Sequence, residues 1–286
     1  MSEWGFDLAR QAPYLLHTLS AFAALHLQHF SHNKDPELDD LYDHHFHSGI
    51  EMYSQALSSE IEPENVDAMF AACMLFAFLA YTAPSRGPPR DTDAIAPAST
   101  DLVWLMSQCG FLTLKTTTQC HLSTSIWHDL FAESDSQGSQ LKVPMDLTST
   151  PSAWLNLCGI DATSTDANNP YYRALHMLLL IQHIDASKPA NFSPFISFPG
   201  RMRSEFMELV QQRDKVALLL LAHWLAKMCE MGQWWCDAKV RSECWAICDY
   251  LGDHASYKGG CEGQQLLIEG LLRAPMRACG YPARLV

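Results

Sequence analysis

The chain has 286 residues, 48% of them hydrophobic, and its formal charge is −13 because 19 Lys and Arg stand against 32 Asp and Glu. This length and apolar content are enough for a sizeable core in one large domain or two small ones, and we favour one helical domain over 1–286. The deficit of basic residues excludes a surface that neutralises phosphates, so we expect no direct nucleic-acid contact.

Ten cysteines would indicate a disulfide framework in a small secreted protein. However, the first residues, MSEWGFDLARQ, have neither the basic nor the apolar region of a secretion signal. Most of the cysteines lie inside apolar helical patterns, where a free thiol behaves as a small hydrophobic group. The longest apolar runs are about half as long as a bilayer-spanning helix. We therefore expect an intracellular protein, in the cytoplasm or nucleus, without a membrane span.

Three helices are predicted in the first third of the chain. Residues 8–30 place apolar side chains at intervals of three and four, with Pro13 near the first turn, and residues 37–57 follow a similar spacing. The third helix starts near Pro63 and is almost continuously apolar over 68–80. That run makes it one candidate for a buried centre.

The middle of the chain alternates polar segments with short helices. Residues 84–100 and 134–152 are polar, lack apolar periodicity and predict flexible loops. Short helices are predicted at 100–110, with Gly110 just after the C-terminus, and at 121–131.

The C-terminal half is organised around residues 205–251, whose pattern predicts two helices joined near Gly232. The centre of this segment, VALLLLAHWLA at 216–226, is apolar around the whole helical wheel, so the rest of the chain should cover it. Before it, residues 171–184 predict a helix. Residues 187–200 contain three prolines and three phenylalanines and predict an extended connection anchored by aromatic rings.

A last short helix is predicted at 264–273, ahead of a tail that contains Pro275, Gly280 and Pro282. No segment alternates for long enough to require a sheet. The predicted fold class is all-α, a single large helical bundle.

Three stretches carry a resemblance to a known family. They are PYLLHTLSAFAALHL at 13–27, PENVDAMFAACMLFAF at 63–78, and SFPGRMRSEFMELVQQRDKVALLLLAHWLAKMCEMGQWW at 197–235. Together they resemble the regulatory domain of fungal zinc-cluster transcription factors, in the branch that includes the sterol uptake control proteins. The resemblance implies a helical bundle whose C-terminal part encloses a hydrophobic pocket for a small molecule, a sterol in the best-known members.

The chain departs from that family in one respect. The DNA-binding module of the family is basic and has six cysteines in two closely spaced groups, but this sequence has no C-x-x-C pair. Its closest cysteines, Cys244 and Cys248, have three residues between them. The DNA-binding activity of the family therefore does not carry over.

Aromatic, Met and His residues are the candidates for the pocket. Flat rings and flexible thioethers suit a rigid apolar ligand, and a buried imidazole can orient a ligand hydroxyl or carbonyl. His223 is the first choice for such a polar group. The alternative is an ordinary core with histidines that bond to the protein itself. The candidate ligand-binding residues are His223, Trp224, Met228, Trp234, Trp235, Met74, Phe78 and His176.

Histidine clusters were weighed as metal ligands, since imidazoles on facing helices can bind zinc. The two Glu-x-x-His pairs or the His-Glu-x-x-His motif of such sites are missing, so we predict a polar helix surface, no metal and no cofactor. The histidines concerned are His26, His29, His32, His44, His45 and His47.

The sequence also contains no nucleophile motif and no glycine-rich phosphate loop. His183 and Asp185 could form an acid/base pair, but a spacing of two puts them on different helix faces. The catalytic residues therefore stay unknown.

Two functions remain open. The first is a domain that binds a hydrophobic small molecule, such as a sterol, terpenoid or polyketide, and regulates transcription through a change in helix packing. The second is an enzyme of fungal secondary metabolism that catalyses a cyclisation or cycloaddition by positioning its substrate, without a metal. A protein-binding scaffold is a third, weaker alternative, and the sequence is compatible with a homodimer.

Overall fold

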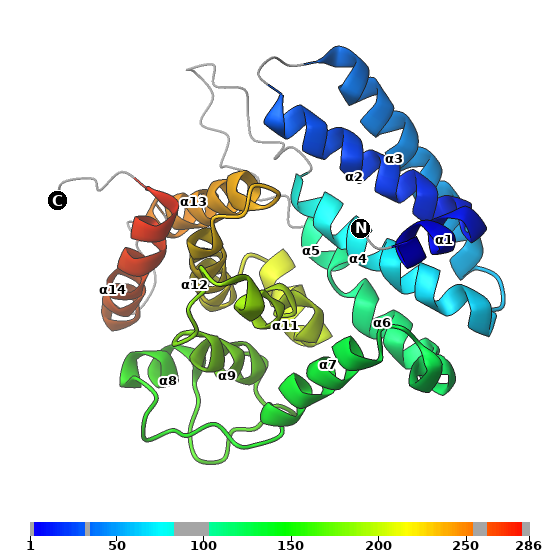
Figure 1. Cartoon of the computed structure of the whole chain (residues 1–286). Helices are drawn as coiled ribbons and strands as arrows, with labels where there is room; N and C mark the ends of the chain where they lie inside the picture. Colours follow the sequence, from blue (N-terminus) through cyan, green and yellow to red (C-terminus); the bar gives the residue numbers. More distant parts are fainter. Residues whose placement is uncertain (1–2, 32–34, 83–102, 254–261, 282–286) are drawn as a thin grey trace. The chain divides into compact units, whose positions relative to one another are not determined.

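The computed structural model describes residues 3–31, 35–82, 103–253 and 262–281. These residues form fourteen α-helices and four short 3₁₀ helices with no strand among them, so the all-α prediction is confirmed (Figure 1). The loop predicted at 84–100 lies outside the described residues. Contacts within the chain group into two compact units. Unit 1 is Met1–Ala80 with Ser107–Asp135, and unit 2 is Tyr81–Met106 with Ser136–Val286.

Unit 1 begins with three helices, α1 (Glu3–Gln11), α2 (Pro13–Phe30) and α3 (Pro36–Leu57). The predicted helix at 8–30 is therefore two helices. The break falls at Ala12, which is extended because the ring of the proline that follows disfavours a helical conformation there. Helices α2 and α3 pack together along their length, and Gly49 allows a close approach. A Cβ at Gly49 would lie 3.1 Å from the Thr18 hydroxyl oxygen.

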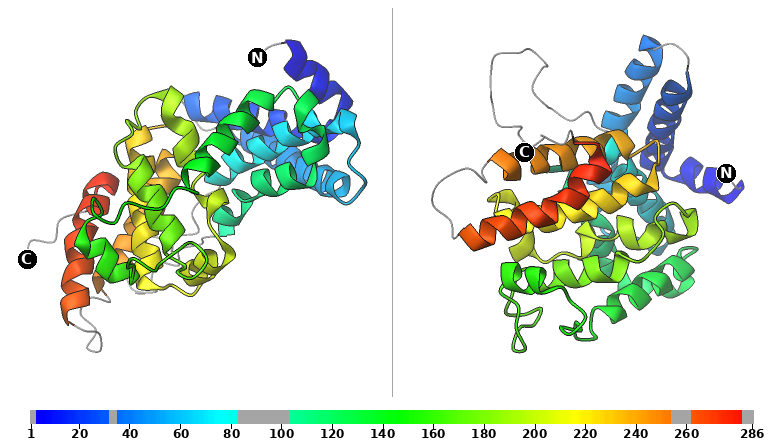
Figure 2. Two further views of the ribbon diagram at one scale, coloured as in Figure 1. Left: turned by 90° about the horizontal axis from the view of Figure 1, so that it is seen from below. Right: turned by 90° about the vertical axis from the view of Figure 1, so that its left-hand side faces the viewer.

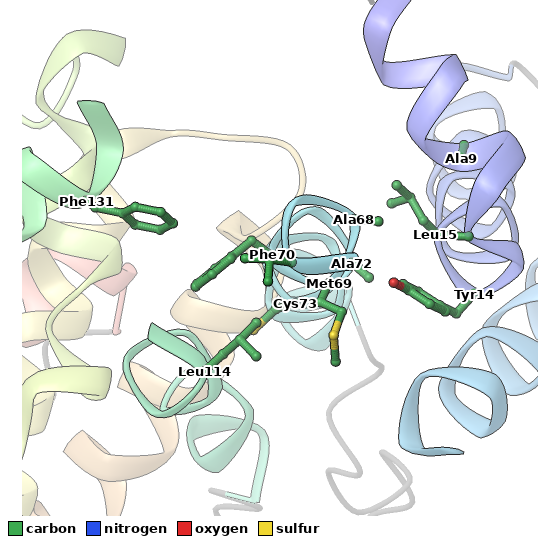
Figure 3. Packing of buried hydrophobic residues seen from close by; sticks show 12 residues of the cluster. Ala9, Tyr14, Leu15, Ala68, Met69, Phe70, Ala72, Cys73, Leu114 and Phe131 are labelled. Atoms are coloured by element: carbon green, nitrogen blue, oxygen red, sulfur yellow. The ribbon is translucent and has the colours of Figure 1, made fainter. Parts of the chain in front are cut away.

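The core of unit 1 surrounds α4 (Val66–Thr82), which follows the 3₁₀ turn η1 (Pro63–Asn65). In Figure 3 the ring of Phe70 points toward Phe131, while Ala72 faces α2 on the opposite side. The Phe70 and Phe131 ring centroids are 4.7 Å apart. The other elements of this unit are α6 (Gly110–Thr117), η2 (Gln119–Thr124) and the start of α7 (His128–Gln140).

One stretch of the described residues, Pro63–Thr82, is long and apolar enough to cross a membrane. However, 44% of its most apolar window is buried inside the protein, and one helix of this kind is weak evidence for a membrane span. The part of the chain that the structure describes therefore contains no clear membrane span.

Unit 2 is built around α12 (Lys215–Met231), the helix whose apolar centre predicted that the rest of the chain covers most of its sides. Thirteen of its 17 residues are buried. It packs against α13 (Asp237–Asp253), α14 (Glu262–Cys279), α9 (Tyr172–Ile181) and α11 (Ser204–Gln211). Figure 2 shows α14, in red, alongside the yellow and orange helices α12 and α13. The remaining elements are α5 (Val103–Ser107), α8 (Ser152–Cys158), η3 (Pro189–Asn191), α10 (Phe192–Ile196) and η4 (Pro199–Arg201).

The segment 205–251 contains three helices, one more than predicted. Arg213 adopts a left-handed conformation with φ 59°, which ends α11. The next residue, Asp214, then caps α12, and its carboxylate accepts hydrogen bonds from the backbone N–H groups of Val216 and Ala217. The predicted junction at Gly232 is confirmed, since this glycine ends α12 with φ 58°.

Four other sequence predictions differ from the structure. Residues 187–200 form short helices rather than an extended connection, although Phe195 and Phe198 are fully buried as expected. Residues 134–140 continue α7, where the Gln137 amide bonds to Ser193. Gly110 begins α6 instead of following a helix, and α14 continues through Pro275 to Cys279. The structure also adds α8, for which the sequence pattern gave no prediction.

The cap at Asp214 provides a stability test for the central helix. Asp214→Ala removes the acceptor for two N–H groups and for the Tyr171 hydroxyl, which lies 3.0 Å from the carboxylate. We expect a loss of about 1–2 kcal/mol in the free energy of unfolding, measured by urea denaturation. Asp214→Asn keeps an acceptor oxygen and should retain most of the stability. An equal loss in both variants would contradict the capping role.

Candidate functional site

Trp224, the central aromatic residue of the predicted pocket, is fully buried on α12. Its indole Nε1 donates a hydrogen bond of 2.8 Å to the backbone carbonyl of Phe195. Its ring stacks on Phe198, with centroids 5.4 Å apart, and on Trp104 at 6.1 Å. Met228, one turn further along, is also fully buried. Protein groups therefore cover both faces of the indole and bind its only donor.

The remaining aromatic and Met candidates are divided between the two units. Trp234 and Trp235 are half-buried at the junction of α12 and α13, and Trp235 makes an edge contact with Tyr81 at 5.2 Å. Met74 and Phe78 are half-buried on α4 and belong to unit 1.

His223, the predicted polar group of the pocket, forms a hydrogen bond to the backbone of α14. Pro275 lies inside α14 and has no N–H, so it cannot donate to the carbonyl of Leu271 four residues before it. The His223 Nε2 donates to that carbonyl at 2.9 Å. The edge of the imidazole also packs on Trp154, with centroids 4.9 Å apart. The hydrogen bond to the Leu271 carbonyl, which can only accept, assigns the Nε2–H tautomer to His223.

Loss of water also lowers the pKa of both candidate histidines, half-buried His223 and buried His176. Loss of water lowers the pKa of His223 to about 4, against the opposing effect of its bond to Leu271. His176 is buried on α9 beside Tyr172, and burial lowers its pKa while the charge of Asp166 acts in the opposite direction. His223 is therefore neutral at pH 7.

A cavity of about 120 Å³ lies elsewhere in unit 2, between α9, α10 and the end of α7. Six apolar side chains form most of its wall. The side chains of Gln137, Ser197 and Arg201 form a polar corner together with that of Gln140. None of the eight predicted residues lines it. The lining residues are Gln137, Gln140, Leu141, Met177, Leu180, Ile181, Ile184, Pro194, Ser197 and Arg201.

The polar corner of the cavity is a set of connected hydrogen bonds. The Ser197 hydroxyl donates to the Gln137 Oε1 at 3.0 Å, and the same oxygen accepts from Arg201 Nη2 at 3.4 Å. Arg201 Nε also donates to the Ser197 oxygen at 3.4 Å. Only 8% of Arg201 is exposed, so its guanidinium is a charged donor group in a largely dehydrated place.

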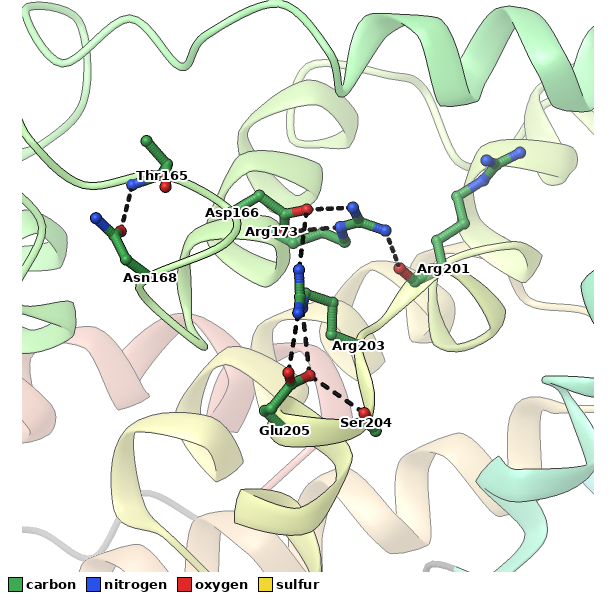
Figure 4. A network of polar contacts seen from close by, with 8 residues as sticks. All are labelled: Thr165, Asp166, Asn168, Arg173, Arg201, Arg203, Ser204 and Glu205. Atoms are coloured by element: carbon green, nitrogen blue, oxygen red, sulfur yellow. Dashed lines mark hydrogen bonds and ion pairs between the residues drawn. The ribbon is translucent and has the colours of Figure 1, made fainter.

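A surface network fixes the backbone that carries Arg201 (Figure 4). Arg173 makes a two-pronged ion pair with Asp166, and its Nη1 donates to the Arg201 carbonyl at 3.3 Å. Arg203 links Asp166 to Glu205, whose pKa is lowered to about 2 mainly by the hydrogen bonds from Arg203. In Figure 4 the Arg201 guanidinium points away from this network. The network therefore positions Arg201 through its backbone and leaves its side chain directed elsewhere.

The structure groups a different set of histidines from the one weighed above. His17 of α2 meets His44 and His45 of α3, and one ligand nitrogen from each lies within 4.8 Å of the others. The Nδ1 atoms of His17 and His45 are 3.0 Å apart, so one must donate and the other accept. Burial and then repulsion from the two neighbours lower the pKa of His45. His32 lies outside the described residues.

The weak acid/base pair is also separated by local bonds. Asp185 accepts from the Ser187 hydroxyl at 2.6 Å and pairs with Lys188 at 3.4 Å. The nearest hydrogen-bonding group to His183 Nε2 is the Gln182 amide at 3.0 Å. Both carboxylate and imidazole thus have partners within their own turns.

No model of a known protein family matches this chain, and no curated protein matches it. Arg201 is not among the residues predicted from sequence. An arginine close behind Phe195 and Phe198, two aromatic residues of a segment predicted to be anchored by its rings, was the one signal that could have marked it.

The neutral state of His223 predicts a pH effect on stability. Its folded pKa of about 4 lies below the ordinary value of 6.5, so the unfolded chain binds the proton more readily between these values. The stability that the neutral His223 contributes is therefore fully present above pH 6.5, and it is lost as the pH falls toward 4. His223→Gln keeps an N–H donor for Leu271 but does not titrate.

Between pH 7 and pH 5 the unmodified protein should lose about 2 kcal/mol more stability than His223→Gln, measured by urea denaturation at each pH. The comparison cancels the titration of all other groups. Parallel pH profiles for the two proteins would show that the imidazole does not titrate in this window.

Proposed function

We propose that this chain binds a small apolar molecule with one polar group, such as a hydroxyl, carbonyl or carboxylate, in the cavity beside Arg201. The observation that carries this proposal is the distribution of lining residues. Six apolar side chains surround a corner where a buried guanidinium, an amide and a hydroxyl converge. Ligand sites typically combine an apolar wall with a few convergent polar groups in this way.

The size of the cavity limits the ligand. A volume of 120 Å³ is close to that of engineered cavities that bind benzene, and smaller than the roughly 300–1,000 Å³ of drug-sized sites. One ring or a short chain therefore fits the present conformation. A sterol, a larger terpenoid or a polyketide requires the lining side chains to move. Leu180 can do so most readily, since it is 37% exposed at the edge of the cavity.

The resemblance to the regulatory domain of fungal zinc-cluster transcription factors supports a sensing role. Two residues of the polar corner, Ser197 and Arg201, lie inside the resembling stretch 197–235. The same stretch includes α12, against which the cavity helices α9 and α10 pack. A ligand with different affinities for two packings of these helices would shift their populations. We propose that the chain acts in transcription regulation in the cytoplasm or nucleus, as a monomer or homodimer.

Arg201 provides the first test of the ligand site. A panel of aromatic and terpenoid alcohols, ketones and carboxylic acids, with a sterol as the largest member, is screened by thermal shift and isothermal titration. Arg201→Gln should weaken the tightest ligand about 10- to 100-fold, the equivalent of one hydrogen bond to a charged group. The control Arg273→Gln, on the exposed surface of α14, should bind normally.

Leu180 provides a second test that leaves the buried arginine in place. Leu180→Trp adds bulk at a partly exposed wall position and should abolish binding while the circular dichroism spectrum and melting temperature stay close to normal. The matched control is Leu266→Trp, because Leu266 is 67% exposed on α14 and far from the lining residues in sequence. Unchanged affinity in Leu180→Trp, or no ligand in the whole panel, would refute the proposed site.

The enzymatic alternative, a cyclisation or cycloaddition of an apolar substrate, is tested in the same experiment. Mass spectrometry and chromatography of the recovered ligands would reveal a rearranged product. Recovery of every ligand unchanged favours the binding domain.

A further inference from the structure

Three cysteine thiols meet in the core of unit 2. Cys244 and Cys248 lie on α13 and Cys279 is the last residue of α14, and their Sγ atoms all lie within 4.8 Å of one another. The first two are fully buried and the third nearly so.

The local structure explains why these sulfurs converge. A spacing of four puts Cys244 and Cys248 on one face of α13, and this helix packs against both α12 and α14. Helix α14 then ends at Cys279 because Gly280 is left-handed, with φ 76°. The N–H of Tyr281 returns to the carbonyl of Met276 at 2.8 Å, a Schellman-type end that holds Cys279 against α13.

Buried thiols are usually inert hydrophobic groups, and two other cysteines of unit 2 fit that description. Cys158 and Cys236 are buried, and burial raises the pKa of each to about 12. The cluster differs because three sulfurs lie together in one place. The Cys244 thiol lies 3.7 Å from the carbonyls of Ala222 and Pro275, and the Cys279 thiol donates to the carbonyl of Met276 at 3.6 Å.

A positive charge also lies beside the cluster. Arg241 of α13 donates through Nη1 to the carbonyl of Ala278 at 2.7 Å and through Nη2 to the carbonyl of Cys229 at 3.2 Å. Its guanidinium is thus held beside the residue that precedes Cys279. Three thiolates around a divalent cation have a net charge of −1, and Arg241 offsets only part of it because its Nε also pairs with the Asp237 carboxylate at 2.8 Å.

We propose that Cys244, Cys248 and Cys279 form a three-thiolate site for Zn²⁺ or another soft d¹⁰ cation. Tetrahedral zinc with Zn–S bonds of about 2.3 Å separates its sulfurs by about 3.8 Å. The three sulfurs are already within about 1 Å of that separation. Binding releases the thiol protons to solvent, and thiolates exclude the hard cations Mg²⁺ and Ca²⁺.

The test uses the full chain in a phosphine reductant after removal of metals with a chelator. Co²⁺ should produce the intense near-ultraviolet absorption of thiolate-to-cobalt charge transfer, and one equivalent of Zn²⁺ should abolish it. Zn²⁺ should also raise the melting temperature, and native mass spectrometry should show one bound ion. Cys248→Ser and Cys279→Ser should lose all three effects, whereas Cys158→Ser should keep them.

A second variant separates this site from the histidine group in unit 1. His45→Gln should leave the cobalt charge-transfer band unchanged, since imidazole nitrogens do not produce it. Folded, reduced wild-type protein that shows no such band would overturn the proposal, and so would a band that persists in Cys279→Ser. Should the serine variants fail to fold, the wild-type titration alone provides this result.

Discussion

The burial of α12 on most sides is the constraint on which unit 2 depends. Thirteen of the 17 residues of α12 are buried and only Lys215, His223, Lys227 and Glu230, on one side of the helix, are not, so five neighbouring helices must supply apolar surfaces for the rest. Full burial of one leucine side chain contributes about 2 kcal/mol, and α12 contains four consecutive leucines, Leu218–Leu221, all buried. These residues alone provide a gain comparable to the whole stability of a typical domain before the entropy of folding is subtracted.

Because neighbouring helices cover α12 so closely, unpaired polar groups beside it would be costly. Nearby side chains and backbone groups supply their hydrogen-bond partners. Pro275 in α14 has no N–H, so the carbonyl oxygen of Leu271 lacks its helical donor. Leaving this oxygen without any hydrogen bond inside the protein would be costly. The His223 imidazole supplies that donor. The indole of Trp224 is satisfied in the same way by a backbone carbonyl on α10. The polar atoms that seemed suited to a ligand from sequence thus stabilise the packing around α12.

Apolar periodicity was sufficient to predict most of the helices and the buried centre, because the spacing of apolar residues depends directly on which faces of a helix are buried. Boundaries depended on single backbone conformations that spacing does not show. Examples are the left-handed Arg213 and the extended Ala12. The candidate site was harder still, since Gln137 and Arg201 are 64 residues apart and come together only in the fold. In the same way, the spacing of Cys244 and Cys248 puts them on one face of a helix, but it does not show that Cys279 of α14 lies beside them.

The position of Arg201 connects the cavity to the central helix. Burying a guanidinium is costly unless hydrogen bonds compensate, and here the compensation comes from both sides of the η4 turn. Gln137 and Ser197 bond to the side chain, while Arg173 holds its carbonyl. Helix α11 begins three residues after Arg201 and packs on α12. If the proposed ligand competes for the guanidinium, it would change the hydrogen bonds of this turn, and the contact of α11 with α12 would connect that change to the core of unit 2.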